Sequence, residues 1–212
     1  MNFAFRTISL AIIGAIVLFS PLTAISETSG FHKGAGTFVR ALANDAITNL
    51  TGNALTDLQR QEKLRGILKS YFDVNSIGKW VLGRHWRKAS AAERSEYLGL
   101  FEDLIVKTYA VRFKSYSNEK IKLTGTASRG QTAIVKSVIE RGSQQPVRVD
   151  WRVTYPDGQY KIFDVVIEGV SMIQTQRSEF SSVIRRNGGR VSGLIATLKN
   201  RSRSAAGNQT SN

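Results

Sequence analysis

The stretch from Tyr160 to Phe180, YKIFDVVIEGVSMIQTQRSEF, joins an apolar strand directly to an amphipathic helix. Side chains in a strand alternate between its two faces. One face would carry Tyr160, Ile162 and Val166, and the other Phe163, Val165 and Ile167. Because both faces are apolar, we expect this strand to be central in its sheet. One of the two faces could line a cavity.

Alternating apolar and polar residues predict three further strands before this one, over residues 121–123, 133–139 and 147–155. The third alternates without a break, through Val147, Val149, Trp151, Val153 and Tyr155. Glycine-containing turns at residues 129–130, 141–143 and 156–158 would connect the strands in succession. The pattern therefore predicts a meander of four antiparallel strands.

Apolar residues at helical spacing predict helices on both sides of this meander. Before it, we expect helices over residues 31–51, 55–72 and 77–82, and a longer helix that begins after Ser90. Ser90 and Glu93 form a capping box, which is typical of a helix start. After it, residues 172–184 and 191–198 predict two more helices, separated by Gly188 and Gly189. The expected fold class is α+β, with helices packed on a mostly antiparallel sheet.

The N-terminus is typical of a secretory signal. Arg6 precedes an apolar run from Ile8 to Phe19, which is too short to span a bilayer, and small residues follow. We expect cleavage after Ser26, with an uncleaved membrane anchor as the alternative. The predicted organisation is a signal peptide over residues 1–26, one domain over 27–201 and a disordered tail over 202–212.

The chain is strongly basic, with a formal net charge of +14. Removal of residues 1–26 would delete one positive charge and no acid, which leaves +13. An exported chain does not meet nucleic acid, so anionic lipid head groups, anionic polymers or an acidic protein are the expected partners of this charge. A merely solvated surface is the alternative. The sequence contains no cysteine, which excludes disulfides and thiolate catalysis.

Residue patterns typical of catalysis or metal binding are missing from the sequence. The two histidines, His32 and His85, have no metal-ligand spacing around them. Asp164 and Glu168 would lie about 13 Å apart along one strand, too far for a glycosidase pair, and cross-strand ion pairs with arginine are the simpler interpretation. We therefore expect no catalytic residues, no metal and no cofactor.

Two blocks of sequence resemble the MlaC family of periplasmic phospholipid carriers. The first is Trp80 to Tyr97, WVLGRHWRKASAAERSEY, with Phe101 and Thr108 to Ala110 after it. The second is Glu168 to Phe180, with residues 184–185, 188–189 and 194–199 after it. With the export signal, the resemblance covers nearly the whole mature chain. The family includes carriers of the toluene-tolerance type and a hopanoid-associated branch, HpnM. The two blocks do not distinguish a phospholipid carrier from a hopanoid carrier.

The resemblance implies a cavity between sheet and helices, with a fold in part like nuclear transport factor 2, that holds both acyl tails of a phospholipid. The lipid would be cargo rather than a cofactor. The implied partners are an inner-membrane ABC transporter with an MCE-domain subunit and an outer-membrane lipoprotein complex. Exchange between them in the periplasm would maintain the lipid asymmetry of the outer membrane.

We predict the residues that touch lipid from the strand or helix face on which they lie and from their position in the blocks that resemble the family. Val170, where the strand ends and the helix begins, is the first choice, and Val170→Glu is expected to fold but to lose lipid. The predicted lipid-binding residues are Leu104, Ile105, Tyr109, Val149, Trp151, Val153, Val166, Val170, Met172, Ile173, Phe180 and Ile184.

Periodicity does not distinguish a filled core from a core with a cavity in it. An envelope adaptor with a packed core, a carrier of hopanoid or another lipid, and an exported polymer binder therefore stay open as alternatives. A hydrolase would need a nucleophile and a base, for which the two histidines lie in a poor context.

Overall fold

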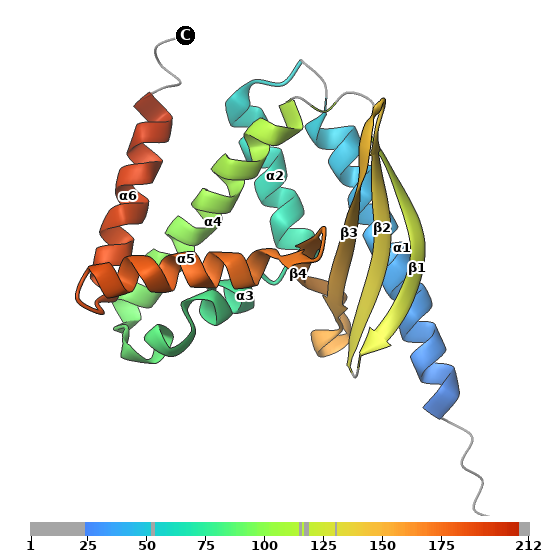
Figure 1. The fold of residues 1–212 in the computed structure, drawn as a ribbon, viewed down its shortest axis with the longest axis horizontal. Coiled ribbons are helices and arrows are strands. Elements are labelled where there is room, and N and C mark those ends of the chain that lie inside the picture. Colours follow the sequence, from blue (N-terminus) through green and yellow to red (C-terminus); the bar gives the residue numbers. More distant parts are fainter. Residues whose placement is uncertain (1–23, 52–53, 115, 117–118, 130, 208–212) are drawn as a thin grey trace, which may run out of the picture.

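The computed structural model describes residues 24–51, 54–114, 116, 119–129 and 131–207 of the 212-residue chain. Within them the chain forms six α-helices and one open five-stranded antiparallel sheet, which confirms the predicted α+β class (Figure 1). The predicted signal peptide lies mostly outside the described residues, and its cleavage stays a prediction. None of the described helices combines the length and hydrophobicity needed to cross a bilayer.

Four α-helices precede the sheet, and two follow it. The first four are α1 (Ala24–Leu50), α2 (Asp57–Tyr71), α3 (Val74–Leu82) and α4 (Ala91–Lys114), with a 3₁₀ turn, η1 (Gly83–Lys88), between α3 and α4. The last two are α5 (Met172–Arg186) and α6 (Val191–Gly207). Figure 1 shows α1 running along the sheet, while α2 to α6 gather to one side of it.

Side-chain caps fix the starts of α2 and α4. The predicted capping box of α4 is present, since the Glu93 N–H donates to Ser90 Oγ over 3.2 Å and the Ser90 N–H donates to Glu93 Oε2 over 2.9 Å. Helix α2 begins with a second capping box, between Thr56 and Gln59, that the sequence reasoning overlooked. Each box satisfies backbone N–H groups that have no partner inside the helix.

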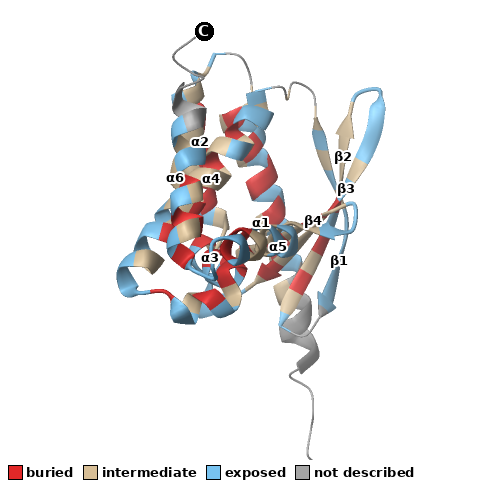
Figure 2. Cartoon of the chain, turned by 60° about the vertical axis from the view of Figure 1, so that its left-hand side comes forward, coloured by how far each residue is buried: buried red, intermediate tan, exposed pale blue. Residues whose placement is uncertain are grey.

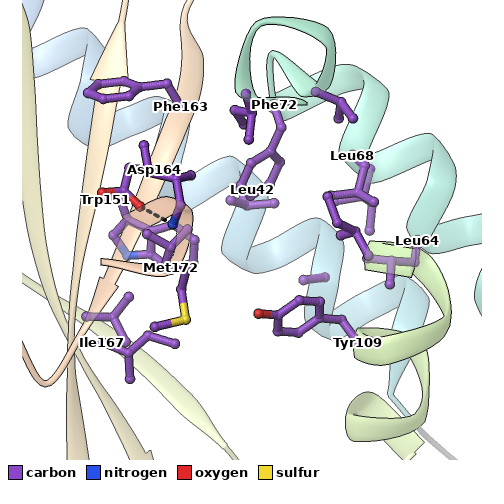
Figure 3. A pocket seen from close by; sticks show the side chains of 18 of the residues that line it. Leu42, Leu64, Leu68, Phe72, Tyr109, Trp151, Phe163, Asp164, Ile167 and Met172 are labelled. Carbon is purple, nitrogen blue, oxygen red and sulfur yellow. Dashed lines mark hydrogen bonds between the residues drawn. The ribbon is translucent and has the colours of Figure 1, made fainter. Parts of the chain in front are cut away.

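The sheet is a meander in the order β1-β2-β3-β4-β5. Its strands are β1 (Lys120–Arg129), β2 (Thr132–Arg141), β3 (Gln144–Thr154), β4 (Lys161–Ile167) and β5 (Val170–Ser171), with a short 3₁₀ turn, η2 (Pro156–Gly158), before β4. The four predicted strands are present, and the two-residue β5 adds a fifth. The face that carries Val149 and Trp151, called the inner face below, points toward the helices (Figure 3).

A bulge in β4 makes one prediction about this strand wrong. Val153 pairs with Ile162, whereas Trp151 pairs with Val165, so one extra residue of β4 is accommodated near Phe163. Because directly paired residues share a face, Ile162 lies on the inner face rather than with Val166. Strict alternation cannot reveal such a shift.

The helices form their own core beside the sheet. Tyr97 and Phe101 of α4 stack with centroids 5.8 Å apart, and both meet Phe180 of α5 edge to face. Gly78 allows α3 to approach α4 closely, since a Cβ there would lie 2.8 Å from Leu98. In Figure 2 the buried residues of these helices face the interior that they share.

The C-terminal helix is longer than predicted. Helix α6 extends to Gly207, into the segment expected to form a disordered tail from Ser202 onward. The Lys107 ammonium of α4 donates to the carbonyl of Ser202 over 3.3 Å and to its hydroxyl over 2.5 Å. This contact holds the start of the extension against α4. The rest of the predicted tail, residues 208–212, lies outside the described residues.

Candidate functional site

An apolar cavity of about 280 Å³ lies between the inner face of the sheet and the helices (Figure 3). This volume is close to the lower end of the range for small-molecule pockets, about 300 Å³. Figure 3 shows Trp151, Ile167 and Met172 facing Leu42 and Tyr109 across the cavity. The cavity is therefore bounded by strands on one side and by helices on the other.

The strand wall is formed by the inner face of β1 to β4. Its lining side chains are Ile121, Ile139, Val149, Trp151, Phe163, Val165 and Ile167. Trp151 is fixed in place because its indole N–H donates to Ser137 Oγ over 2.9 Å, and that hydroxyl donates to the Val149 carbonyl over 3.0 Å. The indole N–H is thus satisfied within the sheet, and the ring presents an apolar surface.

The helix wall draws on five helices. From α1 and α2 the lining includes Leu42, Ala43, Ala46, Leu50, Leu64, Ile67 and Leu68, with Phe72 just after α2. From α3 and α4 it includes Val74, Ile77, Val81, Phe101, Ile105, Tyr109 and Phe113, and from α5 Met172, Ile173 and Gln176. Leu50, Phe113 and Ile121 place one end of the cavity where α1 and α4 end and β1 begins.

Asp164 is the charged side chain of this lining, and its carboxylate is fully engaged by the protein. It accepts from the Arg152 guanidinium over 2.9 Å, from Ser171 Oγ over 2.8 Å and from the Ile173 N–H over 3.2 Å. These bonds tie β4 to the first turn of α5. The expected ion pair of Asp164 with an arginine is thus present, and the carboxylate serves the architecture of the wall.

Glu168 and Gly169 form the two-residue turn between β4 and β5, with φ angles of 48° and 82°. Such a pair of positive φ values is typical of the tight turns that join antiparallel strands. Glu168 Oε1 accepts from the Arg148 N–H over 2.5 Å, and Oε2 accepts from the Arg148 guanidinium over 3.1 Å. The backbone hydrogen bond, aided by the guanidinium, lowers the pKa of Glu168.

The remaining polar groups of the cavity are hydroxyls and one amide. Gln176 Nε2 donates to Glu179 over 3.2 Å, away from the lining. Tyr109 Oη forms no hydrogen bond among the described residues, and the Arg112 guanidinium lies 5.1 Å from the centroid of its ring. In the described ranges, no group of three or more His, Cys, Asp or Glu side chains is placed to hold a metal ion. The cavity therefore suits a long apolar ligand.

Six of the twelve predicted lipid-binding residues line this cavity. They are Ile105, Tyr109, Val149, Trp151, Met172 and Ile173. Four others are buried away from the cavity lining: Val153, Val166, Phe180 and Ile184. Leu104 is half-buried and packs against the core without lining the cavity. The role of all twelve in lipid binding stays a prediction.

Val170, the first choice from the sequence, is 53% exposed on β5 and is not part of the lining. The tight turn at Glu168 and Gly169 places it on the edge of the sheet. A charge at this position would remain in water, so the structure provides no reason for Val170→Glu to block the cavity.

The sequence reasoning missed the contribution of α1 and α2. It assigned Leu42, Ala46, Leu64 and Leu68 to ordinary core-facing stripes, because a stripe that faces a cavity has the same spacing as one that faces a filled core. The small side chains Ala43 and Ala46 were the available signal. On a face otherwise occupied by leucines, they leave space beside the inner face of the sheet.

Comparisons with known proteins agree with this geometry. The chain is 25% identical over 175 residues to the intermembrane phospholipid transport system binding protein MlaC of Haemophilus influenzae. The aligned residues cover 78% of this chain and 79% of that protein. A solved phospholipid-binding protein from Ralstonia solanacearum, in complex with a phospholipid, superimposes with a TM-score of 0.71 at 22% identity and covers 81% of this chain and 98% of the other. This likeness shows a shared fold.

The family profile described as MlaC protein matches residues 40–200. The matched region contains α2 to α5 and the whole sheet, and it therefore includes nearly every wall of the cavity. The chain belongs to the MlaC family.

Proposed function

We propose that this protein carries a two-tailed phospholipid across the periplasm, with the acyl tails in the cavity between the sheet and the helices. The observation that carries the proposal is a cavity between sheet and helices whose wall is almost entirely apolar, and in which the carboxylate of Asp164 is bonded to protein groups. The phospholipid transport protein of Haemophilus influenzae and the phospholipid-bound protein of Ralstonia solanacearum, both similar to this chain, support the cargo class.

The hydrophobic effect supplies the affinity in this proposal. Burial of one methylene is worth about 0.8 kcal/mol, so two tails of about 16 carbons represent at most about 25 kcal/mol before the costs of binding. This total requires the helices to move away from the sheet when lipid binds, since a cavity of about 280 Å³ is too small for both tails. Head-group contacts contribute far less. A carrier that held both tails would therefore bind many phospholipids with similar strength, and tail length would matter more than head-group chemistry.

We place the head group at the end of the cavity formed by Leu50, Phe113 and Ile121. Ile121 also lines an adjoining polar hollow, together with Lys120, Glu140 and Arg141. The two cations could meet a lipid phosphate, while the tails would extend past Tyr109 toward α3. This orientation leaves the charged part of the lipid in water, where its transfer costs least.

Release then requires a partner, because tails held this firmly do not leave into water at a useful rate. We propose exchange with an outer-membrane lipoprotein complex and an inner-membrane ABC transporter that has an MCE-domain subunit. Each would offer an equivalent apolar path, and their unequal affinities or ATP hydrolysis would set the direction. This exchange would maintain the lipid asymmetry of the outer membrane.

A carrier fits the cavity better than a hydrolase does. Among the described lining residues there is no serine, threonine, cysteine, histidine, lysine or arginine to act as nucleophile or base. The envelope adaptor with a packed core, another of the alternatives, would leave the cavity itself without a role.

A transfer assay tests the proposal. The processed protein, which lacks residues 1–26, is mixed with donor vesicles that contain a self-quenched fluorescent phospholipid. It is then separated from these vesicles and added to acceptor vesicles. A carrier should extract about one lipid per protein and deliver it to the acceptor. A protein that extracts no lipid at any concentration, while remaining folded by circular dichroism, would overturn the proposal.

A further inference from the structure

A group of exposed cations lies where η1 meets the end of α5. We call it the basic corner, and it consists of Arg84, Arg87, Lys88, Arg185, Arg186 and Arg190. Three of these residues belong to η1, two lie at the end of α5, and Arg190 directly precedes α6. Figure 1 shows the segment after α3 and the α5–α6 turn at the same end of the helical part.

Arg177 of α5 joins this helix to the junction between α3 and η1. Its guanidinium lies 4.6 Å from the centroid of the Trp80 ring and donates to the Trp80 carbonyl over 3.3 Å. It also packs against Gly83, where a Cβ would come within 2.9 Å of Arg177 Cζ. Gly83 has a φ of 56°, so the turn from α3 into η1 and the contact with α5 both favour glycine at this position.

The charge of the corner is not compensated by nearby acids. In the described part of the chain, none of its six cations forms an ion pair. The sequence has no acid after Glu179, and Glu179 itself pairs with Arg201 over 2.8 Å. Glu93, the first acid after η1, accepts from the N–H of Ser90 in the α4 capping box. The field of the corner therefore extends into solvent.

His85 is buried beneath these cations, and its ring nitrogens have no hydrogen-bond partner among the described residues. Burial, followed by the charges of Arg84, Lys88 and Arg185, lowers the pKa of His85. The imidazole thus stays neutral at neutral pH. The electrostatic influence of Arg84 and Lys88 from η1 and of Arg185 from α5 on one imidazole agrees with the contact between these two segments that Arg177 makes.

We propose that the basic corner docks the protein on bilayer surfaces that contain anionic phospholipid. Each basic side chain near such a surface is attracted to it independently, and a fixed geometry is not needed. The buried core of a protein–protein interface is usually more apolar than its rim. Among the described residues of α3, η1, α5 and α6, Trp80 is the one large apolar side chain that is exposed, and a single tryptophan suits the membrane interface.

Docking through this corner would keep the cavity near the bilayer. Gln176 lines the cavity and Arg185 belongs to the corner, and both lie on α5. Nine residues of helix separate them, a rise of about 14 Å. The docking surface is separate from the cavity and does not depend on what the cavity carries.

Vesicle sedimentation tests this proposal on the processed protein. The wild type should bind phosphatidylglycerol vesicles and not phosphatidylcholine vesicles, and the binding should weaken steeply between about 0.05 M and about 0.5 M salt. The triple variant Arg84→Gln, Arg185→Gln, Arg186→Gln should bind the anionic vesicles roughly 100-fold more weakly, because each charge contributes about fivefold.

The matched control removes three exposed cations from elsewhere, as Lys33→Gln, Arg40→Gln, Lys136→Gln, so that both triple variants have the same net charge. The control should retain most of the binding. Equal losses in the two variants would overturn the proposal, because net charge rather than the corner would then bind the vesicles. A wild type that ignores anionic vesicles would also overturn it and would favour an acidic protein as the partner. Bound lipid measured in the same samples reports separately on the cavity, so the two proposals can fail independently.

Discussion

Filling the cavity from α1 should have opposite effects on stability and on lipid binding. Ala46 lines the cavity and is 9% exposed, between Leu42 and Leu50 on the same helix face. Ala46→Leu adds three carbon atoms that can occupy empty space. Leucine and alanine are both good helix formers, so α1 itself should be unaffected.

The expected magnitudes follow from methylene burial. Three displaced tail methylenes correspond to about 2.4 kcal/mol, or roughly a 50-fold weaker affinity for phospholipid. The same three carbons fill a void in the lipid-free protein and should raise its free energy of unfolding by about 1–2 kcal/mol. Urea unfolding of delipidated protein measures the second quantity, and extraction from fluorescent donor vesicles measures the first.

Ala41→Phe is the control on the same helix, since Ala41 is exposed and an added ring there should change neither quantity much. If this region were a filled core, Ala46→Leu would overpack it and lower the stability by about 1–3 kcal/mol. A destabilised Ala46→Leu variant, or one that extracts lipid as well as the wild type does, would refute the reasoning.

Three further substitutions test other parts of the structure. Asp164→Asn leaves Arg152 without its charged partner and should cost about 2 kcal/mol in urea unfolding, whereas Asp150→Asn on the adjacent strand should cost under about 0.5 kcal/mol. Burial lowers the pKa of His85 in the folded protein, so the unfolded chain binds a proton at this histidine more readily as the pH falls below about 6.5. The free energy of unfolding should therefore decrease between about pH 7.5 and pH 5.5, and His85→Gln should show a smaller decrease than the wild type. Thr56→Ala removes half of the α2 capping box and should lower the free energy of unfolding by about 1 kcal/mol.

The elements of the fold were predictable because their signals are local. The Ser90 and Glu93 capping box marks the start of α4, and the regular alternation from Val147 to Tyr155 covers most of β3. The face of Ile162 was not predictable in this way. The bulge near Phe163 depends on how β4 pairs with β3, and no residue spacing within β4 records it.

The candidate site was predictable only in its strand wall and in parts of α4 and α5. Val149 and Trp151 face the cavity because β3 has one apolar face. Phe180 follows the same helical spacing as Met172 and Ile173, yet it packs between Tyr97 and Phe101 while the other two line the cavity. Whether an apolar face meets side chains or empty space depends on the distance between packed elements, which periodicity does not contain.

The central claim is that the cavity holds a two-tailed lipid, and native mass measurement combined with organic extraction tests it most directly. The processed protein, purified without detergent, should carry close to one phospholipid per chain, and the Ala46→Leu variant should carry much less. Hopanoid in the extract would still support a lipid carrier, with hopanoid in place of phospholipid as the cargo. A wild-type protein that is empty, and that stays empty after incubation with phospholipid vesicles, would contradict the account.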